Sequence, residues 1–373
     1  MRQLPWWAVA GGLILVAGIV AVSVALVAGL GQRGKTGSER PNIILVVADD
    51  LDLALYERLD GLTDLAADGI DYPNAYVTTP LCCPSRVSIL TGQYAHTHGV
   101  RSNNSPGGGY SVARDLGVES QTVAVWLQQA GYRTAFIGKY MNGYNLLEDQ
   151  RTPPGWDVWN ARIKGGSYQD VVIMSGGKGQ KRTLRGYETD RYADVAERFI
   201  RQTQDQPYFL YIAPYAPHDP WIPPERYADE PDPRYGSMLA VVDMINRLRA
   251  TDPDAVLIFT SDNGFHFVPE PPGKGLPIEE DLHVPLFMLG LGRDVDQRYA
   301  LNIDLAPTLA DIAGITPPSP VDGLSLVDRS WERDSFDVEM ANPAGEWVWR
   351  GTWGASPSIE WFMSPPALPD DPD

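Results

Sequence analysis

The sequence predicts an α/β fold in which a mostly parallel central sheet is covered by helices on both faces. Two apolar runs, residues 43–47 (IILVV) and 255–259 (AVLIF), stop abruptly at polar side chains. Buried parallel strands have this composition, and open α/β sheets place their ligands at the carboxyl ends of such strands. Helical and strand-like patterns alternate between the two runs, which is typical of a sheet covered on both sides.

The alternation can be followed along the chain from the spacing of apolar residues and the residues that end each segment. Residues 121–130, for example, are amphipathic and are followed by Gly131, which ends the helix. The expected helices are residues 121–130, 190–201, 235–249 and 302–315, and the expected strands are residues 43–47, 133–137, 208–213, 255–259 and 283–290.

The N-terminal segment predicts a membrane anchor. Residues 6–30 carry no charge and, at about 25 residues, are long enough to cross a bilayer as a helix. We therefore expect a transmembrane signal-anchor over residues 1–30 and a polar linker over residues 31–40. A cleaved signal peptide is the alternative, although its apolar core is usually only ~7–15 residues long.

Such an anchor would place the protein at the cell membrane with its catalytic domain outside the cytoplasm, or would release it from the cell if cleaved. The flanking charges do not favour this orientation, because Arg33, Lys35 and Arg40 follow the segment and only Arg2 precedes it with the amino terminus. The orientation is inferred from the position of the segment alone.

The composition changes again from about Pro317, where Pro, Trp and acidic residues accumulate around a strand-like stretch, EWVWRGTWG. We expect a catalytic domain over residues 41–316, a small C-terminal subdomain over residues 317–364 and an acidic tail over residues 365–373. The whole chain is acidic, with 30 Lys+Arg against 48 Asp+Glu and a net charge of −18. It has no basic block that could neutralise nucleic-acid phosphates, so we expect no nucleic-acid partner.

Oxygen-bearing side chains follow the two apolar runs. Asp49 and Asp50 come after the first run, and Asp262 and Asn263 come shortly after the second. Three carboxylates at one sheet edge repel one another unless a cation neutralises them, and oxygen-only ligation suits Ca²⁺ or Mg²⁺ better than zinc. Each Asp could instead cap a turn or helix, but two pairs on two strands favour a metal site.

The two cysteines of the chain, Cys82 and Cys83, are adjacent and are followed by Pro84, Ser85 and Arg86. A disulfide between neighbours is strained and closes almost no loop, so no disulfide framework is expected. Pro84 suits the first turn of a helix that would end at residue 91 before a closing glycine. The cysteines would then lie at a helix N-terminus, where free N–H groups and the helix dipole favour anions.

These segments resemble signatures of the sulfatase family. LCCPSRVSILTG is similar to the first signature, C-x-P-S-R, and GYRTAFIGKYMNGY to the second, G-Y-x-T-x-x-x-G-K. Three further segments, PNIILVVADDLD before these signatures and APHDPW and TSDNGFHF after them, match the order of sulfatase blocks. The resemblance therefore covers roughly residues 41–325. The Cys-Cys pair and GKY with Asn are most similar to the glucosamine-6-sulfatase and heparan-type branch. The resemblance implies an alkaline-phosphatase-like fold with a reduced C-terminal subdomain.

The resemblance also implies the cofactors. A dedicated formylglycine-generating enzyme would oxidise Cys82 to Cα-formylglycine, whose hydrate attacks sulfur and later expels sulfate, so that one hard step becomes two. Asp49, Asp50, Asp262 and Asn263, together with the oxygen derived from Cys82, resemble the ligands of one divalent metal ion. Ca²⁺ is the favoured ion and Mg²⁺ the alternative.

The matched blocks imply roles for the remaining site residues. Arg86 would stabilise the hydrate, Lys139 and Lys274 would bind sulfate oxygens, and His218 would protonate the leaving alcohol. Lys274 is placed only by its ten-residue spacing to Val284. The sequence departs from the pattern after Lys139, where Met141 and then Asn142 stand in place of a histidine that many sulfatases carry. Asn142 cannot act as a base near neutral pH. It would therefore only orient the hydrate, or another residue would take the proton that the hydrate loses when sulfate is expelled.

Other residues and functions stay open from the sequence. His96 and His98 could line a substrate pocket or pack at a helix end, whereas Cys83 is expected to pack as a small apolar residue. The expected activity is hydrolysis of sulfate esters on a small molecule or glycan. A long polyanion such as heparan is disfavoured by the acidic chain. The alternatives are a phosphodiester or phosphonate monoester hydrolase and a non-catalytic, membrane-anchored binding protein.

Overall fold

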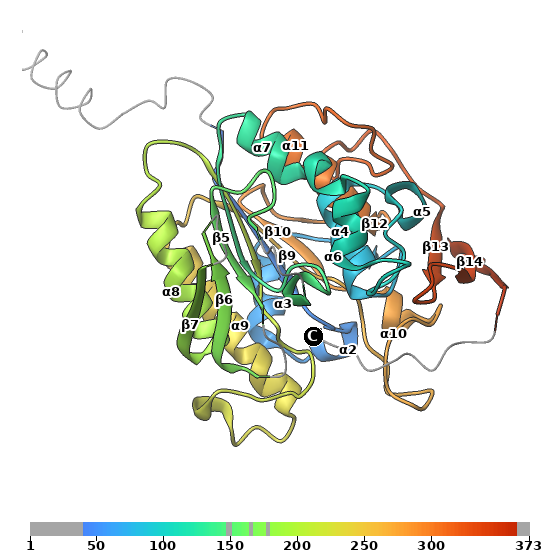
Figure 1. The fold of residues 1–373 in the computed structure, drawn as a ribbon, viewed down its shortest axis with the longest axis horizontal. Coiled ribbons are helices and arrows are strands. Elements are labelled where there is room, and N and C mark those ends of the chain that lie inside the picture. Colours follow the sequence, from blue (N-terminus) through green and yellow to red (C-terminus); the bar gives the residue numbers. More distant parts are fainter. Residues whose placement is uncertain (1–39, 147–150, 164–166, 177–179, 364–373) are drawn as a thin grey trace, which may run out of the picture. The chain divides into compact units, whose positions relative to one another are not determined.

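A ten-stranded sheet runs through the protein in the computed structural model, which describes residues 40–146, 151–163, 167–176 and 180–363 (Figure 1). The strand order is β11-β2-β10-β9-β1-β8-β4-β5-β6-β7. The five central strands are parallel, as predicted for the sheet, although one of them, β5, was not predicted as a strand. Their bounds are β9 Val256–Ser261, β1 Ile43–Ala48, β8 Tyr208–Ala213, β4 Arg133–Gly138 and β5 Val158–Arg162.

The strands that flank this parallel centre are mainly antiparallel. The predicted strand at residues 283–290 forms as β10, Leu286–Leu289, but it pairs antiparallel with β9. β6 (Gln169–Ser175) and β7 (Gln180–Tyr187) extend the other edge and were not predicted. β7 is largely exposed, so its sequence lacks the apolar run that marks a buried strand. The short strands β2 (Ile70–Asp71) and β11 (Asp294–Val295) complete the sheet.

Helices cover both faces of the sheet, as the alternation predicted (Figure 1). The side chains of β1 alternate between the two layers. Ile44 and Val46 pack in the core beneath α3 (Asp60–Ala67), α8 (Glu188–Arg201) and α9 (Pro233–Thr251). Ile43, Leu45 and Val47 pack in the other core, with α4 (Cys82–Thr91), α6 (Gly109–Asp115), α7 (Val123–Gln129) and α11 (Leu305–Ile312).

A second, small sheet forms near the C-terminus. Its antiparallel strands are β13 (Ser335–Ala341), β14 (Trp347–Gly354) and β15 (Ser358–Trp361), so the strand expected from EWVWRGTWG is present. Its apolar side chains share one core with residues of the larger region, including Leu81 just before α4 and Leu282 of α10 (Glu279–Leu282). The C-terminal sheet is therefore packed directly beside the helix that carries the cysteines.

The shorter elements connect this framework. They are the helices α2 (Leu53–Tyr56) and α5 (Ala95–His98), the paired strands β3 (Ala75–Tyr76) and β12 (Ala300–Leu301), and the 3₁₀ helices η1 (Val118–Gln121), η2 (Tyr144–Leu146), η3 (Glu225–Tyr227) and η4 (Asn302–Asp304).

The predicted anchor, linker and acidic tail lie outside the described residues, apart from Arg40. Within the described part of the chain, no helix is both long enough and apolar enough to cross a membrane. The domain boundaries drawn from the sequence stay predictions.

Candidate active site

The ends of two neighbouring strands bring the predicted oxygen ligands together. β1 and β9 are paired in register as far as Ala48 and Ser261, so Asp49 and Asp262 leave the sheet side by side. The Asp50 N–H donates to Asp262 Oδ1 at 3.1 Å, and the Asn263 side-chain amide donates to Asp50 Oδ1 at 2.6 Å. Asp50 has a φ of 65°, a left-handed conformation that Asp and Asn adopt more readily than most residues.

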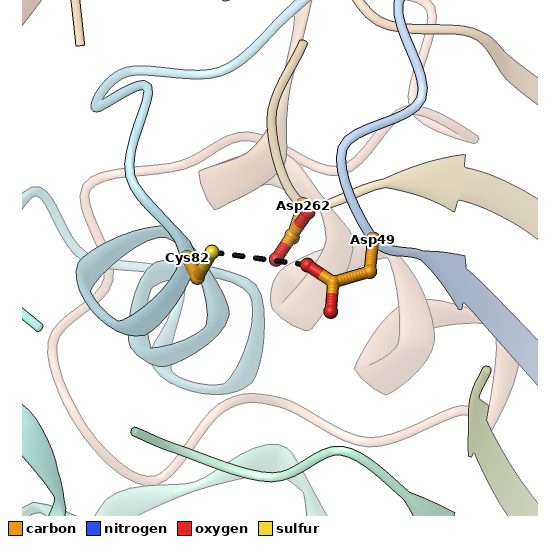
Figure 2. Close-up of side chains that lie close together, drawn as sticks. All are labelled: Asp49, Cys82 and Asp262. Carbon is orange, nitrogen blue, oxygen red and sulfur yellow. Dashed lines mark hydrogen bonds between the residues drawn. The ribbon is translucent and has the colours of Figure 1, made fainter. Parts of the chain in front are cut away.

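The cysteine helix points at these strand ends. α4 begins at Cys82 and ends at Gly92, whose φ of 72° places it in the left-handed region, as predicted for a closing glycine. The Cys82 sulfur lies 3.7 Å from Asp49 Oδ1, and Figure 2 shows it directed toward Asp49 with Asp262 beside them. Cys82 and Cys83 are both buried, and the structure has no disulfide between them.

Three cationic side chains surround the carboxylates. Arg86 donates through Nε to Asp262 Oδ2 at 2.9 Å and through a terminal nitrogen to the Lys139 carbonyl at 3.0 Å. Lys139 Nζ lies 3.0 Å from Asp49 Oδ2. Lys274 Nζ lies 2.7 Å from Asp50 Oδ1 and 2.7 Å from the Cys82 sulfur. The structure thus brings Lys274, which the sequence placed only by spacing, to the centre of the site.

This pairing changes one argument made from the sequence. Three carboxylates meet three cationic side chains here, so their mutual repulsion does not by itself require a metal ion. The pKa values reflect the mixture. Burial would raise the pKa of Asp49, but Lys139 and Arg86 hold it well below its usual range. Burial raises the pKa of Asp262 to about 6 despite the nearby Arg86.

A better reason to expect a metal is the set of oxygens that converge. Atoms of Asp49, Asp50 and His218 lie within 4.8 Å of one another, as do atoms of Asp49, Cys82 and Asp262. The Asn263 side-chain oxygen is buried and accepts no hydrogen bond from any described residue. A buried carbonyl oxygen without a donor is costly, and a hard cation would satisfy it. The residues present therefore fit a divalent ion.

His218 lies at the mouth of the cluster, with Nε2 3.7 Å from Asp50 Oδ2. Its other ring nitrogen is 2.9 Å from the backbone carbonyl of Asp219, which accepts the Nδ1 proton. Burial and Lys139 lower the pKa of His218, but Asp50 and Asp49 outweigh them and raise it to about 10. The imidazole is therefore held in its protonated form, which can donate from Nε2.

A pocket of about 430 Å³ opens over Asp50, His218 and Lys274. We call it the active-site pocket. Its walls come from the loop after α5, the segment after His218, the loop that carries Lys274, and the end of β13 with the turn that follows it. The lining residues are Asp50, Leu81, Ser102, Asn103, Asn104, His218, Asp219, Pro220, Trp221, Phe265, Pro272, Gly273, Lys274, Met340, Ala341 and Pro343.

The segment that the sequence resemblance covered now has independent support. Residues 41–315 match the family model for sulfatases. The chain belongs to the sulfatase family. Its similarity to individual sulfatases extends over most of the described residues. It is 31% identical over 359 residues to the human N-acetylglucosamine-6-sulfatase, with 78% of this chain and 64% of that protein aligned.

A second sulfatase relative is the extracellular sulfatase SULF-1 homolog of Drosophila melanogaster, which is 31% identical over 373 residues. That alignment covers 81% of this chain and 33% of the relative. The chain thus spans less than two thirds of the length of either sulfatase. These similarities confirm the predicted family and the predicted branch.

Solved structures confirm the predicted alkaline-phosphatase-like sulfatase fold. BT4656, determined in complex with its substrate D-glucosamine-2-N,6-O-disulfate, superposes with a TM-score of 0.71 at 20% identity and covers 87% of this chain and 91% of its own. The phosphonate monoester hydrolase SpPMH from Silicibacter pomeroyi gives a TM-score of 0.66 at 19% identity, covering 86% and 87%. The fold is thus shared by enzymes that act on sulfur and on phosphorus esters.

The structure places the other sulfatase-like residues less centrally. Asn142 is buried after β4, and its backbone carbonyl accepts from Tyr110 N at 2.8 Å, so its catalytic role stays a prediction. His98 is buried with Nε2 3.1 Å from Ser88 Oγ, and burial lowers its pKa to about 3. His96 lies 2.9 Å from Glu339. Neither histidine lines the active-site pocket, and Cys83 packs in the core as expected.

Gly273, Asp281 and Trp349 support the site but were not identified from the sequence, whereas His266 was expected only as a solvated residue or a residue behind the ligands. The loop with Lys274 is held by paired backbone hydrogen bonds between His266 and Gly273, at 2.8 and 2.9 Å. His266 Nδ1 also lies 2.6 Å from Asp281 Oδ1. From the C-terminal sheet, Trp349 Nε1 donates to the carbonyl of Gly275 at 2.9 Å. A tryptophan 74 positions away leaves no local pattern that would connect it to Lys274.

Proposed function

We propose that the protein hydrolyses sulfate esters of carbohydrate or aryl type. The observation that carries the proposal is Cys82, a residue of the first sulfatase signature, at the N-terminus of a helix within 2.7 Å of Lys274 and 3.7 Å of Asp49. The cationic side chains around Cys82 suit a negatively charged sulfate ester.

The family implies two groups that the gene does not encode. A divalent ion, most simply Ca²⁺, would be held by Asp49, Asp50, Asp262 and Asn263, and when bound it would polarise a sulfate oxygen. Cα-formylglycine made from Cys82 by a formylglycine-generating enzyme would supply a hydrated aldehyde as the nucleophile.

The cationic side chains around Cys82 would stabilise the negative charge of the sulfate group. Lys274 and Lys139 flank Cys82, so they are placed to hold the sulfate oxygens as negative charge builds. Arg86 is anchored on Asp262 and on the Lys139 carbonyl. Its two anchors keep it rigid, so it would fix the residue derived from Cys82 rather than move with the substrate.

His218 would supply the proton of the leaving group. It lines the active-site pocket beside Lys274, so an ester whose sulfate reaches Lys274 presents its bridging oxygen toward the imidazole. The Nδ1 proton is committed to the Asp219 carbonyl, which leaves Nε2–H as the donor.

We also propose that the enzyme works outside the cytoplasm. A relative that is 31% identical is an extracellular sulfatase homolog, and residues 1–30 have the composition of a signal-anchor or signal peptide. Attachment to the membrane through that segment belongs to the same proposal. Nucleic acid is not a proposed partner, because the net charge is −18.

Turnover of 4-nitrophenyl sulfate and of bis(4-nitrophenyl) phosphate by protein from its native host would test the activity. We expect faster hydrolysis of the sulfate. Faster hydrolysis of the phosphodiester would favour the second candidate, a phosphodiester or phosphonate hydrolase. The similarity of the fold to that of SpPMH supports this candidate. Peptide mass spectrometry should find formylglycine at position 82, and a wholly unmodified thiol with no turnover would favour a binding protein.

A further inference from the structure

Three aromatic side chains form one side of the active-site pocket and its rim. Trp221 and Phe265 line the pocket, and Phe267 packs beside both of them. The ring centroids are 6.2 Å apart for Trp221 and Phe265, 6.0 Å for Trp221 and Phe267, and 5.2 Å for the two phenylalanines. Phe267 stays 44% exposed. We call these three side chains the aromatic rim, since the apolar face of a ring can stack on such a surface.

The aromatic rim is fixed by a buried arginine. The guanidinium carbon of Arg234 lies 5.4 Å from the centroid of Phe265 and 5.1 Å from that of Phe267. The same guanidinium donates to the Asp50 carbonyl at 3.1 Å and pairs with Asp52. The rim is therefore tied to the strand end that carries the candidate metal ligands, and a cation beneath aromatic rings stabilises them in place.

The backbone of Trp221 supports the same conclusion. Its φ is 54°, a left-handed conformation that a bulky residue adopts only where its surroundings impose it. The fold thus imposes this backbone conformation at Trp221, three residues after His218. A backbone fixed in this way needs less ordering when a substrate binds.

The wall made by the loop after α5 is polar and uncharged. It contains Ser102, Asn103 and Asn104. The Asn103 side-chain oxygen accepts from Cys83 N at 2.8 Å, so its amide is oriented by the helix that carries Cys82. Hydroxyl and amide groups of this kind suit the hydroxyl or acetamido groups of a sugar better than its anionic substituents.

Few charged residues line the pocket. Among the described lining residues they are Asp50, His218, Asp219 and Lys274. Lys274 is 2.7 Å from Asp50 and lies deep in the site, where the sulfate of the ester would bind. The side chain of Asp219 is 66% exposed at the wall, and its Oδ1 lies 3.2 Å from His218 Nδ1. A second anionic group on the substrate ring would therefore meet a carboxylate instead of a further lysine or arginine.

We propose that the active-site pocket selects a sulfate ester on a single ring that carries no second negative charge. The apolar face of that ring stacks on the aromatic rim, and its neutral polar groups face the Asn103 and Asn104 wall. The inference rests on the proposed sulfatase activity for the position of the sulfate. It narrows the substrate class to monosulfated sugars or aryl sulfates.

A matched pair of ligands tests this. N-acetylglucosamine 6-sulfate and glucosamine 2-N,6-O-disulfate share one ring and one ester but differ in the charge at the 2-position. We expect kcat/KM for the monosulfate to exceed that for the disulfate by at least about tenfold, from the like charge of Asp219. Dissociation constants of the Cys82→Ala protein with Ca²⁺, measured by calorimetry for both ligands, should show the same order.

The two measurements separate this inference from the proposed function. If both sugars are hydrolysed and kcat/KM for the disulfate equals or exceeds that for the monosulfate, the inference is overturned. The proposed sulfatase activity is then still supported. Absence of turnover combined with tighter binding of the monosulfate supports the pocket selectivity while the proposed activity fails. Equal or tighter binding of the disulfate overturns the inference whether or not turnover occurs.

Variants locate the selectivity. Phe267→Ala should raise KM for the monosulfate by about tenfold or less, with kcat little changed, because it removes one stacking partner. Phe362→Ala is the matched control, since Phe362 is 52% exposed, whereas only Phe267 of the two packs against the lining residues Trp221 and Phe265. Asp219→Asn should lower the ratio of kcat/KM for the monosulfate to kcat/KM for the disulfate. If neither Phe267→Ala nor Asp219→Asn lowers the ratio of kcat/KM for the monosulfate to that for the disulfate, the selectivity arises elsewhere. That result would overturn the proposed roles of the aromatic rim and Asp219.

Discussion

The floor and the wall of the active-site pocket are built in different ways. The floor is made of side chains at the ends of β1, β9 and β4 and at the start of α4, together with Lys274 from a loop, and its charged groups are buried and paired at 2.7 to 3.0 Å. The wall is made of loops and of the end of β13, with aromatic and amide groups that are half-buried or, at Asn103, buried. The difference suggests that the rigid elements fix the chemistry, whereas the loops decide which ester can enter.

The largest expected effect comes from breaking the floor at Arg86. Arg86→Ala leaves Asp262 buried without its partner, so we expect activity to fall by about a thousandfold and unfolding free energy by about 3–5 kcal/mol. Initial rates and urea unfolding measure the two effects. The control is Arg58→Ala, which removes an exposed pair with Asp232 and should cost less than about 1 kcal/mol. Equal losses in the two variants would mean that burial of the pair is not what matters.

Removal of the proposed divalent ion tests the floor in a second way. Chelation with EDTA should abolish turnover and lower the unfolding free energy by about 2.7 kcal/mol relative to protein with Ca²⁺ at a hundredfold excess over Kd. Thermal unfolding with and without Ca²⁺ gives this value without an activity assay. Asn263→Ala should reduce the stabilisation by Ca²⁺, because it removes the buried oxygen that accepts no described hydrogen bond. An unchanged melting temperature after chelation would argue against a resident ion.

A smaller effect is expected where the wall supports the floor. Trp349→Phe removes the hydrogen bond to the Gly275 carbonyl, next to Lys274, and should lower kcat/KM by about tenfold if the bond is worth about 1 kcal/mol or slightly more. Separate values of kcat and KM would distinguish two effects. A lower kcat would mean that Lys274 no longer stabilises the transition state, whereas a higher KM alone would mean weaker substrate binding. Trp361→Phe is the control, because Trp361 is 44% exposed on the same sheet. Matched losses would reduce the effect of Trp349 to general packing.

The smallest effect concerns a pair on the C-terminal side. The hydrogen bond with Glu339 raises the pKa of His96 above its ordinary value. A raised pKa in the folded state stabilises fully below the unfolded pKa, near 6.5, and this stabilisation is lost as pH rises through the folded value. Because the ring is partly exposed, we expect less than about 1 kcal/mol.

Melting temperatures at pH 5.5 and pH 8.5, for the wild type and for His96→Gln, would reveal this contribution as a difference between the two proteins. A larger loss of stability at low pH in the wild type than in the variant would reverse the expected sign.

The sequence predicted the floor better than the wall. Asp49 and Asp262 could be placed because each follows an apolar strand, and parallel strands bring their carboxyl ends to one edge. Cys82 could be placed because proline and glycine mark the two ends of its helix. These signals are local, so they survive without knowledge of the fold.

The wall depends on contacts between distant segments. Trp349 reaches Gly275 across 74 positions, and Arg234 reaches the carbonyl of Asp50 across 184. No pattern of spacing identifies such partners. For the same reason the exposed strand β7 and the antiparallel pairing of β10 were not predicted, since neither is visible from apolar runs alone.

The left-handed backbone at Asp50 has a further consequence. In a continuing strand, neighbouring side chains point to opposite faces, so two consecutive carboxylates would serve two different sides of the sheet. The reversal of φ to 65° ends that alternation, and oxygens of both Asp49 and Asp50 come within 4.8 Å of His218. One dihedral angle thus brings two consecutive carboxylates to the same side of the sheet, where both are available to the proposed ion.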